Sequence, residues 1–300
     1  MFGKIFKCCG RKEDIVPAAP TTEHPVGTKK AFLVGINKLI APGNDLNGCV
    51  NDVNAMWEKL TDSYGFNPDD IEMLCDYRAT QDAIMAGVKK LVEGAKPYDL
   101  IVFQYSGHGT AIRIPGEHEE CQCLVPTDMD WDDPLTDKML AAEFKKLPLN
   151  SFMTFICDAC HSGSIDRDFA PVVNPHPSAS RFLAPPSDIA VRVKKRKLST
   201  NRMGWRDLRG PNGENTTFLE QRHMLVSGCR DDQTSADAYI DGKYQGAMTA
   251  SLLKALDTFP GANWLSAHEE MVKWLAENNY TQVPQLSGPK IKLEYKVFGE

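Results

Sequence analysis

The amino-acid sequence predicts an α/β fold with a mainly parallel central sheet, helices on both of its faces and one antiparallel edge. Short apolar runs of strand length alternate along the 300 residues with stretches in which apolar side chains recur at helical spacing. This alternation is typical of parallel sheets, whose strands are covered on both faces by helices. The run 290–298 alternates apolar and charged residues, which is typical of an edge strand.

The remaining strands are predicted from apolar runs that stop at polar or glycine-containing segments. In chain order these runs are 29–37, 70–76, 98–106, 121–128, 151–159 and 222–230. Helices are expected between them wherever apolar residues recur every three or four positions. The predicted helices cover residues 46–60, 81–95, 135–147, 246–259 and 264–278.

Charge and proline content divide the chain into four parts. Residues 1–28 are interpreted as a flexible tail and 29–169 as the part that carries the strand tips described below. Residues 170–217 are rich in proline and contain nine Lys or Arg against three acids, which is typical of a long mobile loop. Residues 218–300 resume the alternating pattern, and either complete the same sheet or form a small second lobe.

Net charge and cysteine usage bound the partners and the setting. A net charge of −6 argues against a nucleic-acid-binding protein. Nine scattered cysteines, with no recognisable secretory signal, favour a reducing, cytoplasmic compartment. Cys8 and Cys9 stand among basic and apolar residues, so lipid attachment and membrane association are the alternative to a simple tail.

Two of the predicted strands end in short polar tips flanked by glycine. The string VFQYSGHGTA at 102–111 carries His108, and FICDACHSGS at 155–164 carries Cys160. Ligands bind beyond the carboxyl ends of the strands in such sheets, so the two tips are expected to meet. A thiol and an imidazole suffice for acyl transfer through a thioester, and the backbone N–H groups of Gly109 and Cys160 could hold the oxyanion.

An acidic pocket is expected beside this pair. Residues two apart on a strand share a face, and the first helix starts at the same edge of the sheet. The residues that these rules place in the pocket are Cys49, Asp52, Ser106 and Asp158. A carboxylate beside a thiol opposes thiolate formation, so acids at this position are unfavourable for catalysis alone. They are explained if the site must hold a positive charge. We therefore infer that the pocket binds the cation of an Arg or Lys side chain.

Other chemistries use similar residues. Residues 157–161 spell C-x-x-C-H, the c-type haem pattern, which belongs with exported proteins. Cys157 and Cys160 face opposite sides of a strand, which also argues against a redox pair. A scaffold that binds partners without catalysis is the alternative from another functional class. A zinc site also stays open, although the spacing of its donors matches no usual zinc finger. These donors are Cys121, Cys123, Cys157 and His161.

Several motifs resemble those of the metacaspases, cysteine peptidases of the caspase clan. They are YSGHG, DACHSG, GCVNDV, SGCRDDQTSADAYI, GAMT and PQLSG, spread from about residue 30 to about 298. The resemblance implies a caspase-like α/β sandwich, a monomer, and hydrolysis after Arg or Lys. It also implies that His108 and Cys160 form the catalytic dyad and that the four pocket residues determine specificity.

The resemblance raises two further expectations. Many metacaspases need calcium as an activator, although the chemistry itself requires no cofactor. Asp137 falls at one expected calcium position, but Thr136 stands beside it and Arg167 lies where an acid is expected. The basic segment 170–217 separates the two halves of a protease that prefers basic residues, so self-cleavage or occupancy of the cleft as a pseudosubstrate are both open.

Overall fold

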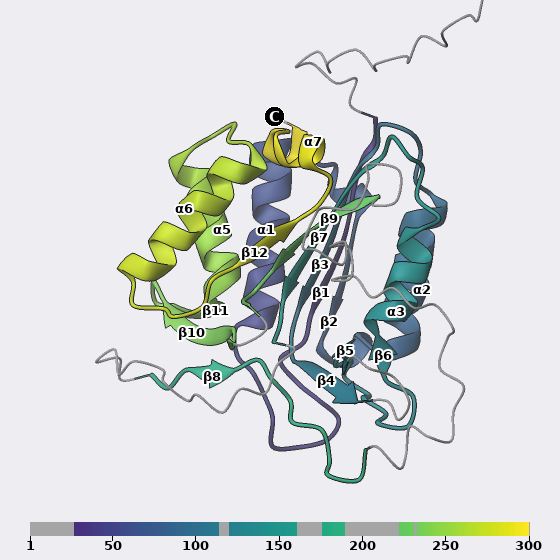
Figure 1. The fold of residues 1–300 in the computed structure, drawn as a ribbon, viewed down its shortest axis with the longest axis vertical. Coiled ribbons are helices and arrows are strands. Elements are labelled where there is room, and N and C mark those ends of the chain that lie inside the picture. The colour runs from purple at the N-terminus through teal and green to yellow at the C-terminus, as the bar shows by residue number, and fades with distance from the viewer. Residues whose placement is uncertain (1–26, 114–119, 161–175, 190–221, 231–232, 300) are drawn as a thin grey trace, which may run out of the picture.

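The computed structural model describes residues 27–113, 120–160, 176–189, 222–230 and 233–299. A six-stranded sheet lies at its centre (Figure 1), in the order β12-β9-β7-β3-β1-β2. Its strands are β1 (Lys29–Gly35), β2 (Ile71–Cys75), β3 (Leu100–Ser106), β7 (Phe152–Asp158), β9 (His223–Ser227) and β12 (Gln285–Ser287). All neighbours pair in parallel except β12, which runs antiparallel to β9. The predicted α/β class and the antiparallel edge are therefore confirmed.

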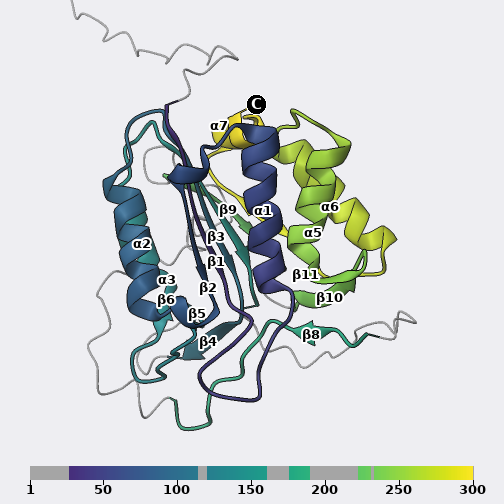
Figure 2. The ribbon, with the colours of Figure 1, turned by 180° about the vertical axis from the view of Figure 1, so that it is seen from behind.

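Helices cover both faces of this sheet, as Figures 1 and 2 show from opposite sides. One face carries α1 (Cys49–Tyr64), α5 (Ala247–Thr258) and α6 (Trp264–Glu277), and the other carries α2 (Gln81–Glu93) and α3 (Asp137–Phe144). Single-turn 3-10 helices flank β2, as η1 (Pro68–Asp70) and η2 (Asp76–Arg78). None of the helices in the described part of the chain is long and apolar enough to cross a bilayer.

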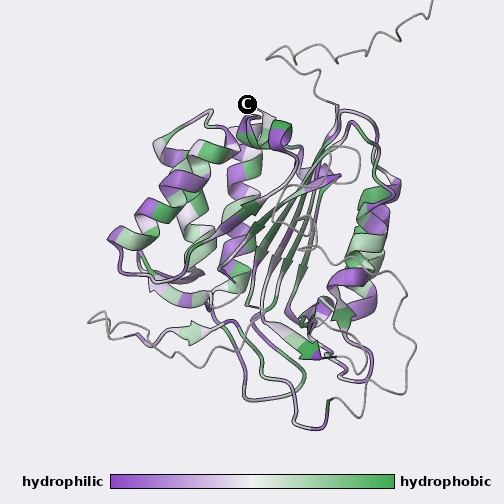
Figure 3. Ribbon diagram, viewed as in Figure 1, coloured by the Kyte–Doolittle hydropathy of each residue, from purple (hydrophilic) through white to green (hydrophobic). Residues whose placement is uncertain are grey.

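The core consists of two apolar layers, one on each face of the sheet, and the strands between them are largely hydrophobic in Figure 3. Phe103 lies in the middle of one layer and stacks on Phe32 and Phe155, with ring centroids 5.6 and 4.7 Å from its own. Leu33, Val102 and other side chains of the opposite strand face pack against α1 and α5 in the second layer. Strands buried on both faces fit the continuous apolar runs of the sequence.

Side chains at the N-caps stabilise the starts of two helices near the positions that the sequence predicts. Thr80 accepts a hydrogen bond from the backbone N–H of Ala83 at the start of α2, and Asn263 accepts one from Ser266 at the start of α6. Helix α1 ends at Gly65, whose φ of 63° is the left-handed conformation that glycine adopts without strain.

The prediction of an edge strand at 290–298 is wrong. These residues form the short helix α7 (Lys290–Leu293) and the 3-10 helix η3 (Val297–Gly299), and the antiparallel edge is β12 instead. Pro289 precedes the first turn of α7. Lys292, which alternation would direct to solvent, is buried and donates from Nζ to the carbonyls of Ser151 and Arg222 at 2.8 and 3.0 Å.

Two small antiparallel sheets lie at the carboxyl end of the central sheet (Figure 1). One contains β4 (Gly109–Arg113), β5 (Glu120–Leu124) and β6 (Leu135–Thr136). The other contains β8 (Ala179–Ser180), β10 (Ala236–Ile240) and β11 (Lys243–Gly246), and the sequence patterns did not predict it.

The predicted division of the chain into four parts can be compared with the structure at three points. Residues 1–26, with Cys8 and Cys9, and 190–221, with the basic run, lie outside the described residues. Residues 176–189 belong to the segment predicted to be a mobile loop, yet they include β8, which pairs with β10. Strands β9 and β12 join the central sheet directly, beside β7.

His223, at the start of β9, makes the stability of the fold depend on pH. Its buried ring packs on Phe144 with centroids 4.8 Å apart, and burial, reinforced by Lys292, lowers its pKa to about 3. Below pH 6.5 the unfolded chain binds a proton that the folded chain does not, so stability falls as pH falls. At pH 5 this loss is about 2 kcal/mol.

We therefore expect His223→Phe to lose less stability than the wild type between pH 7 and pH 5, by about 2 kcal/mol. Urea unfolding at pH 7, 6 and 5 measures the difference. His268→Phe is the matched control, because His268 on α6 is only half-buried. Equal pH dependence of His223→Phe and wild type would contradict a neutral buried imidazole.

Candidate active site

The two polar strand tips lie side by side. Strands β3 and β7 pair in parallel with Ser106 opposite Asp158. His108 and Cys160 each stand two residues beyond that pair, so both are at the same edge of the sheet. Both residues are buried among the elements that surround this edge.

His108 is held in one orientation by the backbone. Its Nε2 lies 2.7 Å from the carbonyl oxygen of Asn44, which can only accept, so Nε2 carries the proton. The lone pair is therefore on Nδ1, which has no hydrogen-bond partner in the described part of the chain. Burial lowers the pKa of His108, and the carbonyls of Asn44 and Arg181 oppose that shift. The imidazole is thus available as a base at neutral pH.

Cys160 is positioned by Ser235, which precedes β10. The backbone N–H of Ser235 donates to the sulfur at 2.6 Å, and the carbonyl of Ser235 lies 3.4 Å from the same atom. The sulfur is thus held from both sides by the backbone of one residue. Neither Asn44 nor Ser235 was a candidate from the sequence, because these contacts are made by the backbone, which carries no sequence signature.

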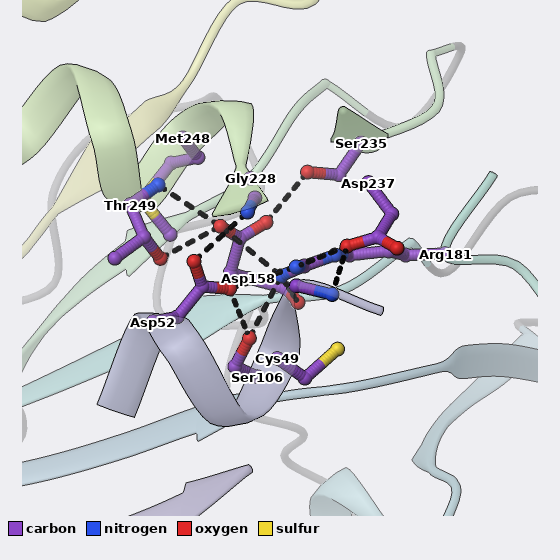
Figure 4. Close-up of polar contacts among 12 residues, drawn as sticks. Cys49, Asp52, Ser106, Asp158, Arg181, Gly228, Ser235, Asp237, Met248 and Thr249 are labelled. Atoms are coloured by element: carbon purple, nitrogen blue, oxygen red, sulfur yellow. Dashed lines mark hydrogen bonds and ion pairs between the residues drawn. The ribbon is translucent and has the colours of Figure 1, made fainter. Parts of the chain in front are cut away.

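The four predicted pocket residues converge in Figure 4, and Ser235, which contacts the Cys160 sulfur, also contacts Asp158. Ser106 donates to Asp52 Oδ2 at 2.6 Å. Cys49 lies one turn before Asp52 at the start of α1, and burial raises the pKa of its thiol. Asp158 accepts hydrogen bonds from the hydroxyls of Ser235 and Thr249, both at 2.7 Å. Asp52 and Asp158 are completely buried, so their charges need a counterion.

The counterion is the guanidinium of Arg181, from the segment predicted to be a loop. Its Nη2 lies 2.7 Å from Asp52 Oδ2, and its Nη1 lies 3.3 Å from Asp158 Oδ2 and 2.8 Å from Ser106 Oγ. A third acid, Asp237 on β10, accepts from Nη2 at 3.0 Å and was not predicted (Figure 4). Arg181 is completely buried.

The charges in this pocket depend on one another. Burial raises the pKa of Asp52 to about 6, and the Arg181 guanidinium opposes that rise. Burial works to lower the pKa of Arg181, but Asp158, Cys49 and Asp52 outweigh it and hold that pKa well above its ordinary value. The arginine therefore stays charged, and its guanidinium is the positive charge that opposes the rise in the pKa of Asp52.

The backbone of Arg181 is held as firmly as its side chain. Its carbonyl oxygen accepts from the N–H groups of Gly109 at 2.8 Å and Cys160 at 3.4 Å, the two donors predicted to form the oxyanion hole. Its own N–H donates to the carbonyl of Ser235 at 3.1 Å. Leu183 then donates to the carbonyl of Gly109 at 2.9 Å. The segment from β8 to Leu183 thus lies against the strand tips, with a bend at Arg181 and the arginine carbonyl beside the thiol residue.

The comparisons with known proteins agree with this geometry. Residues 29–167 match the family model of the metacaspase, peptidase C14 domain. "Metacaspase-1" of Scheffersomyces stipitis is 33% identical over an alignment of 294 positions, which covers 87% of this chain and 70% of that protein. The chain belongs to the metacaspase family. The predicted family is confirmed, and the protein is a cysteine-type peptidase whose substrates are proteins.

Two solved structures of other proteins share the fold of this metacaspase. Caspase-1 from Spodoptera frugiperda aligns with a TM-score of 0.56 at 13% identity, over 93% of this chain and 92% of that one. A protein from Geobacter sulfurreducens aligns with a TM-score of 0.63 at 20% identity, over 91% and 98% of the two chains. The predicted caspase-like sandwich is confirmed.

Asp137, the predicted calcium ligand of this metacaspase, does not lie in the acidic pocket. It begins α3, where its Oδ1 accepts from the Cys121 thiol at 3.2 Å and from the Lys138 N–H at 2.8 Å. Calcium takes six to eight oxygen ligands. The described residues contain no group of three or more His, Cys, Asp or Glu that could hold a metal ion. Arg167 with its neighbouring acids lies outside the described residues, and activation by calcium stays a prediction.

The zinc interpretation likewise finds no complete donor set among the residues that the structure describes. Cys121 and Cys123 lie on β5 of a small sheet, whereas Cys157 lies on β7 within the core beneath α2 and α3. His161 lies outside the described residues. Described cysteines and acids thus form no metal-binding group, and Cys121 is instead engaged by Asp137.

Proposed function

We propose that this metacaspase is an endopeptidase that cleaves after Arg or Lys through a Cys160–His108 dyad. One observation supports this most directly: Arg181 places its cation among buried acids while its carbonyl accepts from Gly109 and Cys160 N–H. A substrate residue held in the same way would present its carbonyl carbon to the thiol. The acids then serve as the binding pocket for the residue before the scissile bond.

The reaction follows from the placed groups. His108 Nδ1 takes the proton of the Cys160 thiol, and the thiolate attacks the carbonyl carbon of the scissile peptide. The N–H groups of Gly109 and Cys160 hold the oxyanion of the tetrahedral intermediate. His108 then donates its proton to the leaving amine, which leaves a thioester. Water, deprotonated by His108, hydrolyses the thioester and regenerates the thiol with release of the new carboxylate.

The same contacts support self-cleavage. Arg181 is the one Lys or Arg of 170–217 that the structure describes, and it occupies the pocket, so we assign the Arg181–Phe182 bond as the site. Until that bond breaks, Arg181 competes with every other substrate for the acidic pocket. Pseudosubstrate occupancy and self-cleavage are therefore successive states of one segment.

Peptide cleavage tests the proposal. We expect fluorogenic peptides with Arg or Lys before the reporter to be hydrolysed, and peptides with Asp there to be left intact, because an acid meets the like charges of Asp52 and Asp158. Cys160→Ala and His108→Ala should each lower kcat/KM by a factor of about 10³ or more. Assays with calcium and with a chelator separate activation by calcium from the chemistry.

Cys75→Ala is the matched control, because Cys75 lies on β2 at the far edge of the sheet from Cys160. It should retain wild-type activity. Hydrolysis after Asp, or full activity in Cys160→Ala, would overturn the proposed function.

A further inference from the structure

The acidic pocket has two sides, and each of the two terminal nitrogens of the guanidinium meets one of them. Nη1 of Arg181 faces Ser106 Oγ at 2.8 Å and Asp158, whose carbonyl and Oδ2 lie 3.2 and 3.3 Å away. Nη2 lies between Asp52 Oδ2 at 2.7 Å and Asp237 Oδ1 at 3.0 Å. The planar fork of an arginine can serve both sides at once.

Asp237 cannot follow a smaller cation inward, because the backbone before α1 holds its carboxylate in place. Oδ2 accepts from the N–H of Asn47 at 2.8 Å, and Oδ1 accepts from the N–H of Gly48 at 3.0 Å. A Cβ at Gly48 would lie only 2.3 Å from Asp237 Oδ1, so the glycine permits this close contact. Strand β10 fixes the other end of the residue through its pairing with β8 and β11.

A lysine side chain offers one nitrogen on a flexible stem instead of two nitrogens in a plane. That nitrogen can reach the acceptors on the Nη1 side of the pocket, because Ser106 Oγ and Asp52 Oδ2 lie 2.6 Å apart and Asp158 lies beside them. It cannot occupy the Nη2 position between Asp52 and Asp237 at the same time. Asp237, which is completely buried, would then lose its cationic partner. A buried carboxylate left without a cation is strongly unfavourable.

We propose that Asp237 is a specificity-determining residue that makes this metacaspase select arginine over lysine. The inference rests on the proposed function, since it assumes that the pocket binds the residue before the scissile bond. It goes beyond a general preference for basic residues, because it predicts unequal use of the two.

The test compares two peptides that differ only in Arg or Lys before the scissile bond. We expect wild type to show a kcat/KM at least about tenfold higher for the arginine peptide. Asp237→Asn keeps an oxygen for the Gly48 N–H and removes the charge that faces Nη2, while its amide nitrogen replaces the oxygen that accepts from the Asn47 N–H. It should lower the arginine value much more than the lysine value, so that their ratio falls toward one. Competition from Arg181 scales both values equally and leaves the ratio unchanged.

Asp241→Asn is the matched control. Asp241 is a solvent-accessible acid in the turn between β10 and β11, paired with Lys254 at 2.7 Å, and its substitution should leave the ratio at the wild-type value. Equal kcat/KM for the two peptides in wild type, or an unchanged ratio in Asp237→Asn, would overturn the inference and leave the proposed function standing. Hydrolysis of neither peptide would overturn both.

Discussion

The full-length chain is expected to be cut between Arg181 and Phe182 by its own active site, whereas Cys160→Ala stays intact. The reason is geometric: the Arg181 carbonyl already accepts from Gly109 N–H at 2.8 Å and Cys160 N–H at 3.4 Å, and its guanidinium is paired with buried acids. Holding the reacting groups together in one chain removes the entropy cost of a bimolecular encounter. Intact-mass spectrometry should show fragments 1–181 and 182–300 from the wild type.

Two features separate this prediction from cleavage of the basic segment in general. Cutting should be first order and independent of protein concentration, because the segment lies in the cleft of its own chain. Arg181→Gln should abolish the product at this bond, since glutamine cannot replace the charge, while Cys75→Ala should be cut as the wild type is. A rate that rises with concentration, or cuts confined to residues 192–209, would contradict the assignment.

The arrangement of the strand tips could be predicted because two simple periodicities determine it. Parallel strands end at one edge of the sheet, and alternate residues share a face, so Ser106 and His108 are placed together with Asp158 and Cys160. The structure brings all four to the same cleft through the β3–β7 pairing. Asp52 follows from the chain order, since α1 begins at this edge directly after the loop that leaves β1.

The rest of the cleft depends on long-range folding that no local pattern records. Ser235 and Asp237 come from a hairpin whose strands are short, and Asn44 acts only through its carbonyl. Arg181 is one of nine basic residues in its segment, and nothing in its immediate neighbourhood distinguishes it from the others. A signal existed in the motif around Ser235 and Asp237, but the resemblance alone assigned it no role.

The misassigned segment 290–298 shows the limit of alternation as a signal. Leu293 and Val297 are apolar positions in an alternating pattern, yet Leu293 ends α7 and Val297 begins η3. Pro289 favours the helical start, and the buried carbonyls of Ser151 and Arg222 provide acceptors for Lys292. Burial of a charged group with specific partners is a tertiary property, so hydrophobic pattern alone could not reveal it.

Gly246→Ala is expected to abolish cleavage after basic residues while leaving the dyad intact. Gly246 ends β11 with a φ of −69°, which alanine adopts without strain. A Cβ there would lie 2.2 Å from Asp158 Oδ2 and 2.5 Å from Arg181 Nη1, so the methyl group would occupy the space of the bound guanidinium. Displacing the substrate by about 1 Å typically costs about 100-fold in rate, and we expect at least that loss in kcat/KM for the arginine peptide.

The dyad provides the readout that distinguishes a blocked pocket from a misfolded protein. Iodoacetamide needs no acidic pocket, so alkylation of Cys160 in Gly246→Ala should proceed at least as fast as in wild type once Arg181 is displaced from the cleft. Gly94→Ala is the matched control, because Gly94 caps α2 with a φ of −79° at an exposed position. Retention of arginine cleavage by Gly246→Ala would mean that the side chain before the scissile bond binds outside the space between Gly246 and Asp158. Loss of both cleavage and alkylation would instead place the effect of the methyl group on the fold of the whole cleft.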